Sequence, residues 1–239
     1  MSSALAGICC SVLKGMSASA NPFACRISVE QRTRLLRSIF EAFYEEILLS
    51  GRTVFDTSRR WCALLPVIVD LFPSTRVLCC VRSPAWILDS IERFVQKNAA
   101  EPSRLFNNDA DATVYNRVAL LMNDGFVGRA LNGLRQAWFG DQASYLIALC
   151  YESLVTQPAE TVARLYQLLG EEPFEHDYNN LSYEEPNFDA ELGFPGFHRV
   201  SGPILLKERA TVLPPDIFHR HDQSFWRDPA ENPRNVVVL

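Results

Sequence analysis

An apolar strand that leads directly into a helix is the feature that most constrains the fold of this chain. Residues 76–81 read Arg-Val-Leu-Cys-Cys-Val, a pattern typical of a buried strand. Ser83 and Pro84 follow as the expected N-cap and first-turn residue of a helix over 85–95. Short apolar strands that alternate with helices are the building units of an α/β fold.

Arg82 stands where the strand passes into the helix, and its position predicts an anion site. A cation at the end of the strand and open amides at the start of the helix both attract negative charge. On that helix Ser90 shares nearly one face with positions 83 and 87, so its hydroxyl can point toward the anion that Arg82 holds. Phosphate is the expected anion. Alternatively, Arg82 is a surface arginine and Ser90 a solvated serine.

The same alternation of strands and helices continues along the chain. Residues 1–20 have the spacing of a helix already in progress at the first residue, and Ser28 with Gln31 forms a capping box that opens an amphipathic helix. We therefore expect a parallel sheet with helices on both faces and a ligand at the carboxyl ends of its strands. The further elements expected are strands at 53–55 and 145–150 and helices at 61–72, 113–122, 126–139 and 159–169.

Beyond Glu171 the helical and strand periodicities fade, but aromatic residues remain frequent. A disordered tail would carry fewer aromatic anchors, so we expect an ordered, loop-rich extension. With 48% hydrophobic residues the 239-residue chain can bury a full core. We expect one domain over 1–239, with its core in 1–178 and the loop-rich segment in 179–239.

The charge balance excludes some classes of partner. A net charge of −5 and a pI near 5.4 argue against nonspecific binding of nucleic acid or of acidic membranes. The residues near Met1 include neither a basic region nor a long apolar span, so we expect no signal peptide and no membrane anchor. The seven cysteines lie in apolar runs without metal-ligand spacing. We therefore expect a reducing compartment, the cytoplasm, and no metal.

Two ordered blocks of this sequence resemble sulfotransferases that use 3′-phosphoadenosine-5′-phosphosulfate (PAPS). The first block runs from Val54 through the strand to R-S-P-A-W-I-L-D-S, which ends at Ser90. It resembles the middle of such an enzyme, including the spacing from arginine to serine in the family's R-x-P…S element. The second begins at Tyr151-Glu152 and closes with Pro173-Phe174, similar to the family's Y-E-D-L…P…L-G-x-P-F segment. The resemblance spans residues 53 to 178.

The resemblance implies a binding site for the nucleotide part of PAPS. In the family, the counterparts of Arg82 and Ser90 bind the 3′-phosphate, and the counterpart of Tyr151 packs near the adenine. Arg199 and Lys207 resemble a late basic element that reaches back to the same phosphate. The family needs no metal.

As an enzyme of this family, the chain would transfer a sulfuryl group from PAPS to a hydroxyl of a small molecule, a sugar or a peptide tyrosine. Asp56 lies in the segment where the family places catalytic groups that act on the acceptor. It is our candidate base, and the alternative is an N-terminal cap for the following helix. The expected partner is the acceptor alone, without nucleic acid or membrane; a homo-oligomer is compatible with the sequence.

One family element is missing from the sequence. Family members surround the phosphosulfate with a loop of the form G-x-x-R-S/T-G-S/T after the first strand, and the nearest stretch here, Lys14-Gly15-Met16-Ser17, has no strand before it. We expect the first strand and this loop to be lacking, through a late gene start, a fragment or a true loss. In the last case the chain is an inactive remnant that serves as a nucleotide-binding or interaction module.

Overall fold

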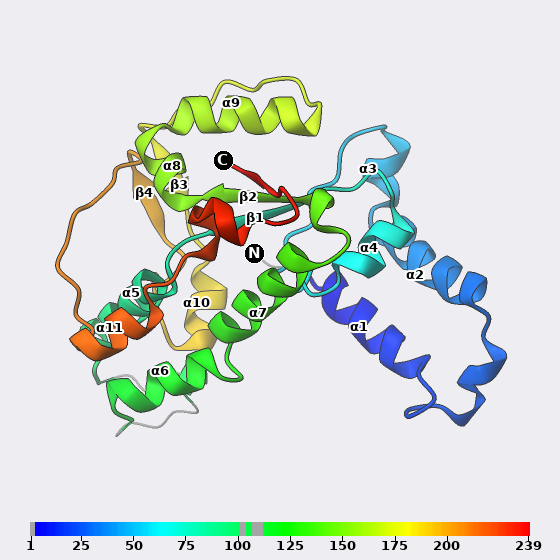
Figure 1. Ribbon diagram of the computed structural model, residues 1–239, viewed down its shortest axis with the longest axis horizontal. Helices are drawn as coiled ribbons and strands as arrows, with labels where there is room; N and C mark the ends of the chain where they lie inside the picture. The colour runs from blue at the N-terminus through cyan, green and yellow to red at the C-terminus, as the bar shows by residue number, and fades with distance from the viewer. Residues whose placement is uncertain (1–2, 101–103, 107–111) are drawn as a thin grey trace. The chain divides into compact units, whose positions relative to one another are not determined.

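Figure 1 shows the computed structural model, which describes residues 3–100, 104–106 and 112–239. The chain forms two compact units, residues 1–77 and 78–239. The expectation of one domain over 1–239 stays a prediction.

The first unit is helical. Its amphipathic helix α2 begins at the predicted capping box, in which the Gln31 amide donates to Ser28 Oγ and the Ser28 amide donates to Gln31 Oε1, at 3.2 and 2.8 Å. α1 begins at Leu5, whose amide donates a hydrogen bond to Ser3 Oγ. The helices of this unit are α1 (Leu5–Gly15), α2 (Val29–Phe43), α3 (Glu45–Leu49) and α4 (Leu65–Leu71), with a 3₁₀ helix at Pro22–Arg26.

Two expectations for the first unit are wrong. Residues 53–55 form no strand in the described chain, and Phe55 is 68% exposed, so its apolar side chain is not buried there. Turns occupy 59–64, and α4 begins only at Leu65. Pro66 explains this start, because a proline fits the first turn of a helix and would break the interior of one that began near residue 61.

The second unit is built on a parallel sheet, which confirms the predicted α/β fold. Its strands β1 (Val77–Val81), β2 (Leu146–Cys150) and β5 (Val237–Val238) lie in the order β1-β2-β5. β5 pairs with β2 in parallel, with Ile147 opposite Val237. Every residue of β2 is buried, as expected of a central strand covered on both faces.

Helices cover the sheet on both sides. In Figure 1, α9 lies above the sheet, and α5 and α7 lie below it. Ile147, Leu149 and Leu239 form a core on one side with side chains from α8 and α9. The helices of the second unit are α5 (Pro84–Lys97), α6 (Val114–Met122), α7 (Phe126–Phe139), α8 (Tyr151–Thr156), α9 (Pro158–Leu169), α10 (Pro186–Leu192) and α11 (Pro215–His221), with 3₁₀ helices at Arg104–Phe106, Ala143–Tyr145, Phe225–Arg227 and Pro229–Glu231.

A second core fixes α5 and anchors the C-terminal segment. Leu88 and Ile91 of α5 pack with side chains from α6, α7 and α11, and the buried Phe194 joins them from the loop after α10. β3 (Leu181–Tyr183) and β4 (Val200–Gly202) form an antiparallel pair. The loop-rich segment is therefore ordered through its apolar anchors, as expected.

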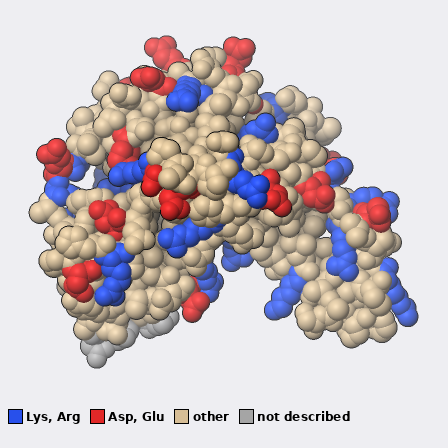
Figure 2. Space-filling view, viewed as in Figure 1, with Lys and Arg blue, Asp and Glu red and all other residues tan. Residues whose placement is uncertain are grey.

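Charges of both signs are interspersed over the face drawn in Figure 2. Among the described residues, no helix has both the length and the apolar character that a membrane span requires. In the second unit, Arg93 and Arg209 both pair with one carboxylate of α5.

Candidate functional site

Arg82 and Tyr151 meet at the carboxyl edge of the sheet. Arg82 directly follows β1, and Tyr151 directly follows β2, the neighbouring strand. The carbon of the Arg82 guanidinium lies 4.1 Å from the centre of the Tyr151 ring, within the range of a cation–π contact. The structure thus brings together two residues singled out from separate sequence blocks, at the edge where open α/β sheets bind ligands.

The Arg82 guanidinium has unused hydrogen-bonding capacity. Its Nε–H is buried and has no hydrogen-bond partner among the described residues. Burial lowers the pKa of Arg82; Tyr151 opposes this shift, and the positive charge of Arg209 adds to it. A buried donor without a partner is costly, so this atom marks a place for an oxygen-bearing ligand.

Ser83 occupies the N-cap position of α5 but does not cap the helix with its side chain. Its hydroxyl donates instead to Asp222 Oδ1 at 2.7 Å, just beyond the end of α11. The predicted side-chain cap is therefore wrong, because the serine ties α11 to the start of α5. Pro84 takes the first-turn position as predicted.

Ser90 is brought together with an arginine that the sequence patterns did not single out. Arg209 Nη2 donates to Ser90 Oγ at 2.9 Å. The Arg209 guanidinium also lies 5.7 Å from the centre of the Trp86 ring, so it is held against α5. Arg82 and Arg209 are close enough for their charges to interact. The polar groups of Arg82, Ser90 and Arg209 therefore lie close together near the first turns of α5.

In the late basic stretch, the arginine that contacts Ser90 is neither Arg199 nor Lys207. Arg199 and Lys207 are exposed, and neither side chain has a hydrogen bond or ion pair in the described part of the chain. Arg209, two positions after Lys207, reaches Ser90 instead. The roles predicted for Arg199 and Lys207 stay predictions, and the basic stretch K-E-R is the signal that could have indicated Arg209.

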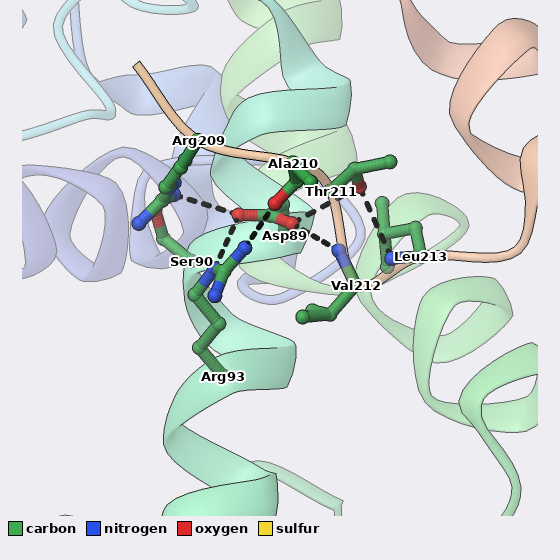
Figure 3. Close-up of polar contacts among 8 residues, drawn as sticks. All are labelled: Asp89, Ser90, Arg93, Arg209, Ala210, Thr211, Val212 and Leu213. Atoms are coloured by element: carbon green, nitrogen blue, oxygen red, sulfur yellow. Dashed lines mark hydrogen bonds and ion pairs between the residues drawn. The ribbon is translucent and has the colours of Figure 1, made fainter. Parts of the chain in front are cut away.

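Asp89 is a fully buried carboxylate beside this cluster (Figure 3). Its Oδ2 pairs with Arg93 Nε at 3.0 Å and with Arg209 Nη2 at 2.7 Å. Its Oδ1 accepts from Thr211 Oγ1 at 3.0 Å and from the Val212 amide at 2.8 Å. Sequence reasoning missed Asp89, although an acid on the apolar face of α5 beside Leu88 was a signal.

The local charge is positive. Three arginines, Arg82, Arg93 and Arg209, lie along α5 with two carboxylates, Asp89 and Asp222, so positive charge is in excess. Glu152, also near Arg82, is neutralised by Arg227, whose Nη2 lies 2.7 Å from Glu152 Oε1. An anion would be attracted to this excess of positive charge.

Asp56 lies in the first compact unit. Its Oδ2 accepts from the Tyr44 hydroxyl at 2.5 Å and its Oδ1 from Trp61 Nε1 at 2.6 Å. Burial and the hydrogen bond to Asp56 raise the pKa of Tyr44 to about 12. Asp56 does not cap a helix, since turns follow it, and its role as a base stays a prediction.

A protein-family comparison matches residues 16–176 to the model described as the sulfotransferase family. The chain belongs to the sulfotransferase family. The match covers more than half of the chain and includes β1, α5, β2 and the Arg82–Tyr151 contact. No curated protein and no solved structure matches this sulfotransferase. Within its described residues, no group of histidine, cysteine, aspartate and glutamate side chains could hold a metal ion.

Proposed function

We propose that this sulfotransferase takes PAPS as its sulfuryl donor and binds the 3′-phosphate with Arg82, Ser90 and Arg209. The partnerless Nε–H of Arg82 at the carboxyl edge of the sheet carries the proposal. A phosphate offers oxygens to that donor and to the second arginine, and its negative charge is attracted to the local excess of positive charge. The face of Tyr151 is the proposed neighbour of the adenine.

The proposed acceptor is a hydroxyl on a small molecule, a sugar or a peptide tyrosine. The acceptor oxygen forms a bond to sulfur while the bond from sulfur to the phosphate oxygen breaks, which releases adenosine 3′,5′-bisphosphate. The acceptor's proton goes to a base, for which Asp56 is the candidate. Tyr44 and Trp61 would orient that carboxylate, since each donates to one of its oxygens.

Calorimetry with two nucleotides tests the phosphate site. Adenosine 3′,5′-bisphosphate carries the 3′-phosphate, and adenosine 5′-monophosphate lacks it. A charge-assisted contact contributes about 1.5–3 kcal/mol, so Arg82→Ala should weaken binding of the bisphosphate roughly tenfold or more. Binding of the monophosphate should change little.

Arg234→Ala is the control for loss of a positive charge, because Arg234 is half exposed and, among the described residues, pairs with the exposed Asp141 alone. This variant should bind both nucleotides as the wild type does. Equal affinity of wild type and Arg82→Ala for the bisphosphate would refute the proposed site.

A second candidate function is nucleotide binding without catalysis. It is favoured by the absence of the G-x-x-R-S/T-G-S/T loop from the sequence. Both candidates predict binding of adenosine 3′,5′-bisphosphate, so transfer of labelled sulfate from PAPS to hydroxyl acceptors distinguishes them. Turnover identifies the enzyme, and binding without turnover identifies the module.

We also propose a cytoplasmic protein that meets its acceptor without a nucleic acid or membrane partner. All seven cysteines are free thiols, which is typical of reducing compartments. Mass spectrometry of protein purified without reductant should find seven free thiols, and a native disulfide would contradict the assignment.

A further inference from the structure

A long segment between β4 and α11, residues 203–214, lies against α5. Its Leu213 packs in the core with Leu88 and Ile91, and most of its polar contacts with α5 meet at the Asp89 side chain. We call this segment the strap. Three of its residues, Arg209, Thr211 and Val212, donate hydrogen bonds to Asp89, and Figure 3 shows them converging on its carboxylate. Arg93 of α5 adds a bond to the backbone oxygen of Ala210. Apart from Leu213, which is buried, the strap is largely exposed.

Asp89 is fully satisfied in its buried position. An isolated carboxylate removed from water would be strongly destabilising, whereas one paired with cations and hydrogen-bond donors is tolerated. Here both oxygens accept two bonds each, and the donors on Oδ1 come only from the strap. The carboxylate therefore joins the strap to α5.

The same carboxylate fixes the direction of Arg209. Arg209 Nη2 lies between Asp89 Oδ2 and Ser90 Oγ, at 2.7 and 2.9 Å, so two consecutive residues of α5 hold one nitrogen. The Arg209 side chain remains 33% exposed, and its Nη1 and Nε have no partner in the described chain. These donors are free to meet a ligand at Ser90.

We propose that Asp89 is a positioning residue that holds the strap on α5 and sets Arg209 beside Ser90 for a phosphate ligand. The inference rests on the proposed function for its ligand. Asp89 itself does not touch the phosphate, because its negative charge would repel it and its oxygens are already occupied. Asp89 acts on the ligand through Arg209. Because it also holds the strap on α5, binding of a ligand to Arg209 should keep the strap ordered.

A double-mutant cycle on nucleotide affinity tests this coupling. Asp89→Asn preserves the shape but removes the charge, and Arg209→Gln removes the guanidinium. Each should weaken binding of adenosine 3′,5′-bisphosphate roughly tenfold, the effect of one charge-assisted contact. If Asp89 acts through Arg209, the double variant should bind about as weakly as Arg209→Gln alone. A merely structural role for Asp89 would make the two losses multiply, and that result would overturn the proposal.

Glu92→Gln is the matched control. Glu92 is another buried acid on α5, and it pairs with Arg117 of α6 at 2.6 Å, away from the strap. This variant also loses a buried ion pair, yet its nucleotide affinity should equal that of the wild type. A weakening equal to that of Asp89→Asn would show that any buried charge on α5 has the same effect.

Tryptic cleavage of the strap gives a readout that needs no ligand. Trypsin cuts after lysine and arginine, so release of the strap should expose the bonds after Lys207 and Arg209. Asp89→Asn should be cut there faster than wild type or Glu92→Gln, and bound bisphosphate should slow cleavage of the wild type. If wild type binds no bisphosphate, the proposed function fails, while unchanged cleavage in Asp89→Asn overturns the positioning role.

If Asp89→Asn does not fold, the Thr211→Val variant tests the same proposal. It removes a single hydroxyl that donates to Asp89 Oδ1, which is a smaller perturbation. A neutral hydrogen bond contributes about 0.5–1.5 kcal/mol, so this variant should weaken bisphosphate binding several-fold and hasten cleavage after Arg209. Wild-type behaviour in both measurements would overturn the proposal.

Discussion

At the scale of single residues, the pKa of Tyr44 is a measure of its burial and of its hydrogen bond to Asp56. Burial and the hydrogen bond to Asp56 keep the Tyr44 hydroxyl protonated up to a pKa of about 12, whereas a tyrosine in the unfolded chain ionises near pH 10. Between these values the folded protein binds more protons than the unfolded chain. The stability from Tyr44 is therefore fully present below pH 10 and is lost as the pH rises toward 12.

We predict that Tyr44→Phe removes the last step of the tyrosinate absorbance titration near pH 12. The free energy of unfolding of this variant should also fall less steeply between pH 10 and 12. Tyr145→Phe is a control for the loss of one phenol. A titration of Tyr44→Phe that still shows the late step would mean that the contact with Asp56 does not form in solution.

Residue by residue, the sequence indicated the local half of the proposed anion site and gave no signal for the distant half that was used. Arg82 and Ser90 could be found because a strand end and a helix face are encoded within a few positions. Their partner Arg209 is 119 positions from Ser90, and Val212 is 123 positions from Asp89. No local pattern specifies such a pairing, since it depends on how the strap folds back onto α5.

At the scale of elements, β5 makes the C-terminal residues part of the central sheet. The Leu239 amide donates to the Ala148 oxygen, and the Cys150 amide donates to the Leu239 oxygen, both at 2.8 Å. Leu239 is 7% exposed and packs with Ile147 and Leu149. We predict that Leu239→Ala lowers the free energy of unfolding by about 2 kcal/mol or more, as truncation of buried leucines does.

Urea denaturation measures this change. Leu205→Ala is the matched control, because Leu205 is 58% exposed in the same unit and should change stability by less than about 0.5 kcal/mol. If the two variants lose equal stability, β5 does not contribute to the core.

The elements with strong periodicity or clear caps were predicted from the sequence, and the others depended on tertiary partners. α2, α5 and α9 combine apolar spacing with capping or first-turn residues. β5 is two residues long and pairs with β2, so its place in the sheet depends on that partner. Residues 53–55 have a strand-like composition but are not part of a strand in the described chain.

At the scale of the whole molecule, the proposed reaction needs donors at both ends of the PAPS nucleotide. The cluster of Arg82, Ser90 and Arg209 is the proposed source of donors at one end. In the family, the glycine-rich loop surrounds the 5′-phosphosulfate with amides and a cation, and this sequence has no such motif.

We therefore predict that the 239-residue chain binds adenosine 3′,5′-bisphosphate but transfers no measurable sulfate by itself. Loss of one preorganised donor to the charge that develops in a transition state slows a reaction by roughly a hundredfold to a thousandfold, and here a whole set is missing. Transfer from labelled PAPS to phenols, sugars and tyrosine peptides measures the rate, and calorimetry on the same preparation verifies an intact nucleotide site. Turnover in that preparation would contradict the prediction and would mean that another segment of the chain surrounds the phosphosulfate.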